Sequence, residues 1–298
     1  MKYDFILSAE STVDLPYPYV ASRDIPVIFY TYTVDDVVYE DDMGRNPNAL
    51  SEFYARLDAG KLPNTSQINT FRYEEYFREL LEQGDVLHLA FAKGMSNSVN
   101  NAYEAAATVA KEFPDRKIIV VDTLASCSGY GLILDDAADM RDAGASMEEI
   151  AQWVKDNALK MYHRIFASSL KQLRRGGRVS GPTAAIGTVL GIIPIMRLDE
   201  VGKIFSYGKV RGKKAAIESL TKSALDNARG GADYDGKLFI CHADCMEDAK
   251  AMEASLHAAL PKAKISIYDI GSVIASHTGR GTIAIFFWGE NDRPAREE

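Results

Sequence analysis

The sequence has few cysteines, no excess of positive charge and no apparent secretion signal. Its three cysteines in 298 residues are too few, and odd in number, for a disulfide framework. Asp and Glu outnumber Lys and Arg by 42 to 34, and a chain of net charge −8 is a poor general nucleic-acid binder because phosphate contacts need clustered cations. The opening MKYDFILSAE lacks a basic segment followed by a long apolar run. These absences predict a cytoplasmic protein without a nucleic-acid partner.

Motifs for dinucleotides, nucleoside phosphates and metals are also missing. Gly129 and Gly131 follow a predicted strand but do not form G-x-G-x-x-G, and the sequence has no P-loop. Cys241, His242 and Cys245 lie close together, yet zinc needs four ligands at characteristic spacings and no second cluster exists. Neighbouring strand residues such as Cys241 and His242 also point to opposite faces. We therefore expect no cofactor and no metal.

One long stretch without charge, residues 179–196, raises the question of a membrane span. It contains Pro182, Pro194 and three glycines. In a lone transmembrane helix the backbone groups freed by Pro194 would have no partner. The stretch is therefore expected to be a buried or mobile apolar element of a protein without a membrane span.

Short apolar runs alternate with helical patterns along the chain, which predicts an α/β fold. The run at 117–122 is continuous, as in parallel sheets buried on both faces. Ser146 and Glu149 form a capping box at a helix start. We predict an N-terminal domain at 1–155, with a mainly parallel sheet, and a C-terminal α/β domain at 156–298. The expected strands are 4–7, 25–33, 85–91, 117–122, 164–168, 203–210, 237–242, 264–269 and 282–288, and the expected helices include 71–82, 98–113, 130–141, 213–228 and 247–260.

Three polar segments could carry chemistry. Thr65 and Ser66 precede a helix that Asn69 or Thr70 is better placed to cap, which leaves these two hydroxyls free. Residues 94–98 (GMSNS) connect a strand to a helix, where α/β sheets bind ligands and helix N–H groups attract anions. His277 lies among Gly and Ser and is expected in a loop, where it could pair with a carboxylate.

The segment GMSNS also resembles the G-x-S-x-G turn of serine hydrolases, with Ser98 in place of the second Gly. Ser96 would then be the nucleophile and His277, downstream, its base. This hydrolase is one alternative, although a turn that is sharp and strained should need the missing Gly.

Positive charge is concentrated between residues 171 and 214. Ten basic residues there face two acidic ones, while the rest of the chain is strongly acidic. A solvated face is one interpretation, and a surface for an anion, an acidic partner or an anionic membrane is the other.

Seven short segments stand out together along the chain: 10–16 (ESTVDLP), 65–67 (TSQ), 94–96 (GMS), Asp122-Thr123 with Gly129 and Gly131, 173–179 (LRRGGRV), 193–195 (IPI) and 277–279 (HTG). In order and spacing they resemble the motifs of the DegV family, the bacterial fatty-acid-binding proteins that serve fatty acid kinase. The resemblance covers nearly the whole chain.

The resemblance implies two α/β domains with a long-chain fatty acid buried between them. It implies carboxylate contacts from Thr65, Ser96 and His277. The protein would be a carrier, not an enzyme, that presents the acid to a separate ATP-dependent kinase for acyl-phosphate formation. Further ligand contacts are expected in the same motifs, at Ser66, Gly94, Asn97 and Thr278.

The chain departs from the family pattern at several of these motifs. Ile68 replaces a Pro and Asn97 a Gly, and Lys93 and Arg280 add positive charge that could support a head group. A carrier of another lipid or small carboxylate is therefore a further alternative. We also expect residues 179–196 to supply tunnel wall or a moving lid, and a basic surface to dock the kinase or touch a membrane; that surface comprises Arg174, Arg175, Arg178 and Lys203.

Overall fold

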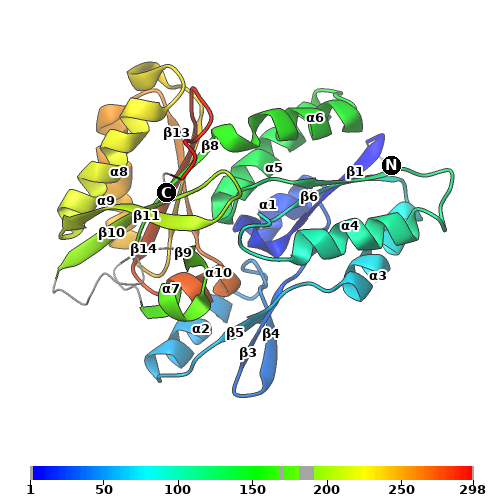
Figure 1. The fold of residues 1–298 in the computed structure, drawn as a ribbon, viewed down its shortest axis with the longest axis horizontal. Helices are drawn as coiled ribbons and strands as arrows, with labels where there is room; N and C mark the ends of the chain where they lie inside the picture. The colour runs from blue at the N-terminus through cyan, green and yellow to red at the C-terminus, as the bar shows by residue number, and fades with distance from the viewer. Residues whose placement is uncertain (1–2, 168–170, 181–190, 297–298) are drawn as a thin grey trace.

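The computed structural model describes residues 3–167, 171–180 and 191–296, and the fold is α/β (Figure 1). A parallel sheet occupies the first part of the chain, in the order β2-β1-β6-β7. All six residues of β1 are buried, since this strand lies inside the sheet beneath helices. The strands are β1 (Phe5–Glu10), β2 (Val27–Ile28), β6 (Asp85–Ala90) and β7 (Ile118–Asp122).

Two helix pairs cover this sheet on opposite sides (Figure 1). The pairs are α3 (Thr70–Leu81) with α4 (Ser98–Val109), and α5 (Cys127–Asp142) with α6 (Met147–Asn157). Asn69 caps α3, and the capping box of Ser146 and Glu149 starts α6, as predicted. The parallel sheet expected in this part of the chain is confirmed.

A second, mixed sheet of seven strands follows, in the order β13-β12-β14-β8-β10-β11-β9. Helices α8 (Lys213–Asn227) and α9 (Met246–Ala259) pack together and cover one face, while α5 contacts β8, β12 and β14. Helix α5 also touches the parallel sheet, since its Tyr130 hydroxyl bonds the Glu10 N–H of β1 and the Leu89 carbonyl of β6. The strands are β8 (Met161–Ala167), β9 (Val179–Ser180), β10 (Ile192–Leu198), β11 (Ile204–Arg211), β12 (Lys237–His242), β13 (Lys264–Asp269) and β14 (Thr282–Trp288). The two large sheets share no strand. The domain boundary between residues 155 and 156 stays a prediction.

A small antiparallel sheet, in the order β4-β3-β5, was not predicted. It lies with two short helices, α7 and α10, which contact each other. Helix α10 also contacts β3 and β5. The elements of this region are β3 (Thr31–Val34), β4 (Val37–Glu40), α2 (Ala49–Asp58), β5 (Asn64–Ser66), α7 (Lys171–Gly176) and α10 (Ser272–Thr278). Helix α1 (Tyr17–Ser22) lies instead beside α5, where the Tyr19 hydroxyl donates to Asp135 (Figure 1).

Three local predictions are wrong. The single strand expected at 25–33 is two strands in different sheets, because the chain leaves β2 at Phe29 and Tyr30 before starting β3. Thr65 lies in edge strand β5, paired with Tyr32, and not in a free loop. His277 lies in the last turn of α10, since a two-turn helix forms in the segment SVIASHT.

The uncharged stretch 179–196 is partly strand, in β9 and β10, and its residues 181–190 lie outside the described part of the chain, as does most of the expected lid. Pro194 is accommodated within β10, where it pairs with Lys209. Among the described residues, no helix has the length and apolarity needed to cross a membrane.

Candidate functional site

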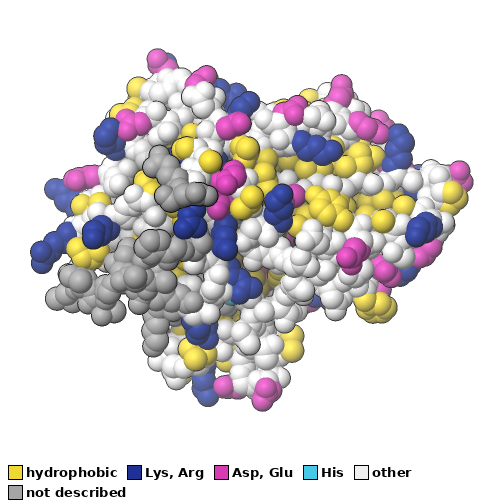
Figure 2. Space-filling view, in the orientation of Figure 1, with side chains coloured by type: hydrophobic (Ala, Val, Ile, Leu, Met, Phe, Trp, Pro, Cys, Tyr) yellow, Lys and Arg dark blue, Asp and Glu magenta, His cyan; other side chains and the backbone are white. Residues whose placement is uncertain are grey.

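A cavity of about 800 Å³, partly open to solvent, is lined by residues from both large parts of the chain. Its walls are mainly apolar, so a ligand that fills it must be mainly apolar too. The apolar lining comes from Phe91, Met95, Cys127, Ile165, Leu173, Ile204, Ile270, Val273, Ile274, Ala284 and Phe286. On the molecular surface, Lys and Arg side chains follow the junction between the two halves (Figure 2).

One polar wall of the cavity is built around His277. The Nε2 atom of His277 lies 2.8 Å from Thr65 Oγ1, which joins α10 to β5. The other ring nitrogen, Nδ1, is buried without a hydrogen-bond partner among the described residues. A Cβ on Gly176 would lie 2.3 Å from that atom, so glycine lets α7 approach the ring. This packing fixes the imidazole.

His277 is neutral at physiological pH. Burial first, and then the positive charges of Arg178 and Arg175, lower the pKa of His277 to about 4. A neutral ring carries one N–H, and a buried N–H without an acceptor is rare. We therefore place the hydrogen on Nε2, where it donates to Thr65 Oγ1. The Thr65 hydroxyl is then free to donate its own hydrogen to an acceptor in the cavity.

Ser96 lies in the same polar wall. Its Oγ is 3.0 Å from Ser98 Oγ and 3.5 Å from the Tyr30 hydroxyl. Ser98 Oγ in turn accepts from the backbone N–H of Ile68, which ties the Ser96 loop to the segment after Thr65. Burial raises the pKa of Tyr30 well above its ordinary value, so this phenol stays a donor.

This geometry does not bring together the nucleophile and the base that the serine hydrolase alternative requires. A serine nucleophile needs its base within hydrogen-bond reach. In the described structure His277 bonds Thr65, whereas Ser96 bonds Ser98 and Tyr30.

The predicted ligand residues divide into two groups. Thr65, Ser66, Ser96, His277 and Thr278 line the cavity. Gly94 and Asn97 are not among its described lining residues. A Cβ on Gly94 would meet the backbone of Val201 at 2.5 Å, so this glycine serves the packing of its loop against the turn between β10 and β11.

Neither cation predicted to support a head group lines the cavity in the described structure. Arg280 forms ion pairs with Asp244 and, at 3.0 Å, with Asp58. Lys93 is exposed and lies near Asp122, whose carboxyl pKa it helps to lower against the effect of burial. The sequence correctly placed Lys93 and Arg280 next to loops that line the cavity, but it did not show which way their side chains point.

The four basic residues expected to form a partner surface have different surroundings in the structure. Arg178 lines the cavity, and Arg175 donates to the Pro63 carbonyl at 3.0 Å. The backbone N–H of Lys203 bonds Asp199 in the turn before β11. The side chain of Arg174 lies outside the described part of the structure. Arg178 is therefore a cation beside the polar wall, a role that its place in a basic run did not reveal.

Two further cavity residues escaped the sequence argument. Tyr30 was hidden in an apolar run that predicted an ordinary strand. Phe91 stands at the end of β6, where its N–H donates to the buried carboxylate of Glu10 at 3.0 Å. Glu10 also accepts from the Tyr73 hydroxyl at 2.5 Å. Glu10, the first residue of the segment ESTVDLP, therefore holds the backbone at Phe91, just before the loop that carries Ser96.

The cysteines lie apart from any described metal cluster. Cys127 lines the cavity, and burial raises the pKa of its thiol well above the ordinary value, so it is not an activated thiolate. Cys241 Sγ lies 2.7 Å from Ser128 Oγ, while His242 Nε2 lies 3.5 Å from Asp269 on the neighbouring strand.

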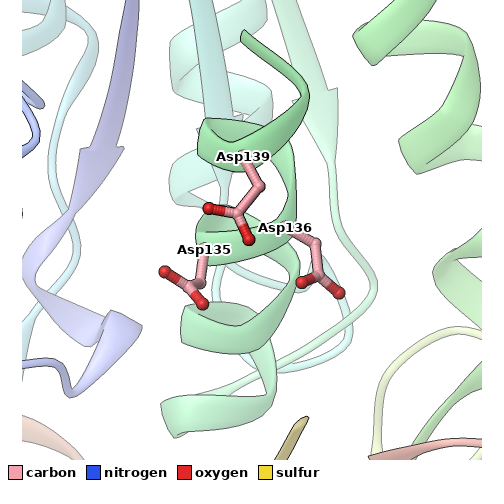
Figure 3. A group of neighbouring side chains, drawn as sticks. All are labelled: Asp135, Asp136 and Asp139. Carbon is pink, nitrogen blue, oxygen red and sulfur yellow. The ribbon is translucent and has the colours of Figure 1, made fainter. Parts of the chain in front are cut away.

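An acidic triad on α5 has the spacing of a metal site: Asp135, Asp136 and Asp139 (Figure 3). The Nζ atom of Lys237 lies 2.5 to 2.7 Å from a carboxylate oxygen of each. These carboxylates are compensated by the lysine, which also attaches β12 to α5.

Comparisons with known proteins agree with this architecture. Residues 6–290 match the family model described as "Uncharacterised protein, DegV family". A DegV domain-containing protein of Clostridium perfringens is 36% identical over 293 residues, which cover 97% of this chain and 99% of that protein. A DegV domain-containing protein of Lactococcus lactis is 34% identical, over 95% of this chain and 96% of its own length.

Solved structures of other DegV family proteins resemble this chain. A fatty-acid-binding DegV family protein from Thermus thermophilus has a TM-score of 0.83 and 27% identity, and the match covers 96% of this chain and 99% of that one. A fatty-acid-binding DegV family protein from Streptococcus agalactiae has a TM-score of 0.82 and 26% identity, over 97% and 100% of the two chains.

Proposed function

Because the chain belongs to the DegV family, we propose that it binds a long-chain fatty acid in the cavity lined by Thr65, Ser96 and His277. The observation that carries this proposal is the cavity's composition. Apolar side chains from both parts of the chain form most of its lining, and hydroxyls, a neutral imidazole and Arg178 form one polar wall. An acyl chain with a carboxylate has the matching chemistry.

The carboxylate would meet donors that need no proton from solution. The Thr65 and Ser96 hydroxyls donate hydrogen bonds, and the Arg178 guanidinium supplies positive charge. The acyl chain drives binding: a sixteen-carbon acid has about fourteen CH₂ groups, each worth ~0.8 kcal/mol on burial. That roughly 11 kcal/mol exceeds what the head group can add and leaves room for the cost of ordering the ligand.

We further propose that the protein acts as a carrier, in the cytoplasm, for a separate ATP-dependent kinase that forms the acyl phosphate. None of the described contacts gives Ser96 a base, and the cavity's polar wall is suited to holding a carboxylate rather than cleaving a bond. The basic residues around α7, with Lys203, are the proposed surface for that kinase or for an anionic membrane.

The first experiment is native mass spectrometry of the protein purified from a bacterial host, followed by lipid extraction. We expect one fatty acid per chain. A bound lipid of another class would favour the alternative carrier, and a protein that stays free of fatty acid after deliberate loading would refute the proposal. A fluorophosphonate probe that labelled Ser96 would favour the hydrolase.

The kinase step needs its own assay. Loaded protein, ATP and a purified fatty acid kinase catalytic subunit should form acyl phosphate, whereas each protein alone should not. If a competent kinase leaves the bound acid unchanged, the kinase partnership is wrong and the binding function stands.

A further inference from the structure

A second cavity, of about 570 Å³ and partly open to solvent, lies beside the start of α10. It shares no described lining residue with the cavity that holds His277. Four aspartates line it: Asp14, Asp41, Asp42 and Asp269. Among its described lining residues there is no Lys, Arg or His.

Asp14 is the least compensated carboxylate in this cavity. The residue is 5% exposed, and neither of its carboxylate oxygens has a hydrogen-bond partner among the described residues. The Cys127 thiol and the Gly271 amide lie close to the carboxyl group and oppose part of the effect of burial on it. Burial and the neighbouring carboxylate of Asp41 raise the pKa of Asp14 well above its ordinary value. A buried, unpaired carboxylate is costly unless a cation or a proton accompanies it.

Asp14 and Asp41 converge on one point. A Cβ built on Gly271 would lie 2.6 Å from Asp14 Oδ1 and 2.9 Å from Asp41 Oδ1. The space that a larger side chain would fill is therefore bounded by two carboxylate oxygens. Asp14 has a φ of 47°, a left-handed conformation that turns the chain at the end of the β1 loop.

Asp41 has the surroundings of an ionised group. It is 2% exposed and accepts from Ser11 Oγ at 3.1 Å and from Ser272 Oγ at 2.9 Å. The Val273 amide is a third donor, at 3.4 Å. Burial raises the pKa of Asp41, and the three donors oppose that effect by favouring the charged form of the carboxyl group beside Asp14.

We propose that this cavity binds a divalent cation of the Ca²⁺ type, held by the carboxylates of Asp14 and Asp41, with the hydroxyl oxygens of Ser11 and Ser272 and water completing its shell. All of these ligands are hard oxygens. Ca²⁺ accepts irregular sets of six to eight oxygens, whereas Mg²⁺ demands a near-ideal octahedron. The proposal does not depend on what the larger cavity binds.

The triad on α5 provides an internal comparison. There the Lys237 ammonium compensates three carboxylates. At Asp14 no cationic side chain does so among the described lining residues, and the cavity beside it is partly open to solvent.

The test is to add CaCl₂ to metal-free protein near neutral pH. Isothermal titration calorimetry measures the binding, and thermal unfolding measures its effect on stability. We expect saturable binding of one Ca²⁺ and a rise of several degrees in the melting temperature at millimolar Ca²⁺, with smaller effects of Mg²⁺. Tb³⁺ should give luminescence on tyrosine excitation, since Tyr268 lines the cavity.

The variant D14N should lose the Ca²⁺ response without losing stability in metal-free buffer, because Asn tolerates the left-handed conformation and carries no charge to bury. D233N is the matched control: it removes one surface carboxylate, paired with Lys262, and should keep the response. S272A keeps both carboxylates and should weaken Ca²⁺ binding severalfold. The proposal is overturned if wild-type protein shows no Ca²⁺ binding, which would assign a shared proton to Asp14 and Asp41, or if D14N responds as wild type does.

Discussion

Replacing His277 with asparagine should flatten the loss of stability between neutral and mildly acidic pH. Burial lowers the pKa of His277 from 6.5 to about 4 in the folded protein. The unfolded chain therefore binds the proton first, so stability is fully present above the unfolded pKa, falls below it, and the loss is complete below pH 4. Linkage gives a loss of about 2 kcal/mol at about pH 5 relative to pH 8.

The assay is urea-induced unfolding of wild type, H277N and the control H257N, at several values of pH from neutral to mildly acidic. His257 is exposed on α9, so H257N should keep the wild-type slope. Burial also lowers the pKa of His163, to about 3, but that residue is common to all three proteins and cancels in the comparison. Equal slopes for wild type and H277N would refute the argument, because His277 would then titrate alike in the folded and unfolded chains.

Three substitutions test other contacts. T65V removes the hydroxyl proposed to bind the carboxylate, so the dissociation constant for a fatty acid should rise roughly tenfold or more in a displacement assay. G129A puts a Cβ 2.4 Å from the His163 ring and should cost about 1–3 kcal/mol of unfolding free energy, whereas G208A, whose Cβ would make only an ordinary contact at 3.9 Å with Ile195, should not. K237M removes the ammonium shared by three carboxylates, two of which keep Arg23, and should destabilise the protein in urea unfolding more than the exposed control K262M does.

A specific outcome would contradict each of these three predictions. T33V, on the neighbouring strand and outside the described cavity lining, should bind fatty acid as wild type does. A T65V protein with that same affinity would remove Thr65 from the head-group site. If G129A is as stable as G208A, the packing of α5 on β8 is looser than the distances indicate. If K237M and K262M lose equal stability, the triad is a solvated surface cluster.

The long buried elements could be predicted from the sequence because each has a strong local pattern. The observed bounds of β12, β13 and β14 coincide with the predicted ones. Strands β12 and β14 are buried apolar runs, and β13 alternates isoleucine with polar residues between turn signals. The small antiparallel sheet escaped prediction because β4 and β5 are short and mostly exposed, so their pairing with β3 leaves no periodicity. Helix α10 was missed for a similar reason: seven residues rich in Ser give too few turns for an apolar stripe.

The site was predictable in its polar loops but not in its charges. Thr65, Ser96 and His277 were marked by loop chemistry and by motif resemblance, and the structure brings all three to one cavity. Lys93 and Arg280 were assigned to the head group from sequence proximity alone, yet Arg280 is held by Asp58 and Asp244. The direction of a long flexible side chain depends on tertiary partners that a single sequence does not display.

Helix α10 is where the two cavities meet. Its first residue, Ser272, bonds Asp41 beside the acidic cavity, Val273 and Ile274 line the larger cavity, and His277 ends it against Thr65. Two turns of helix therefore carry groups of both sites on one rigid element. The segment DLP and the segment HTG, far apart in sequence, thus act on the same element: the first supplies Asp14 behind the start of α10, and the second supplies the ring at its end.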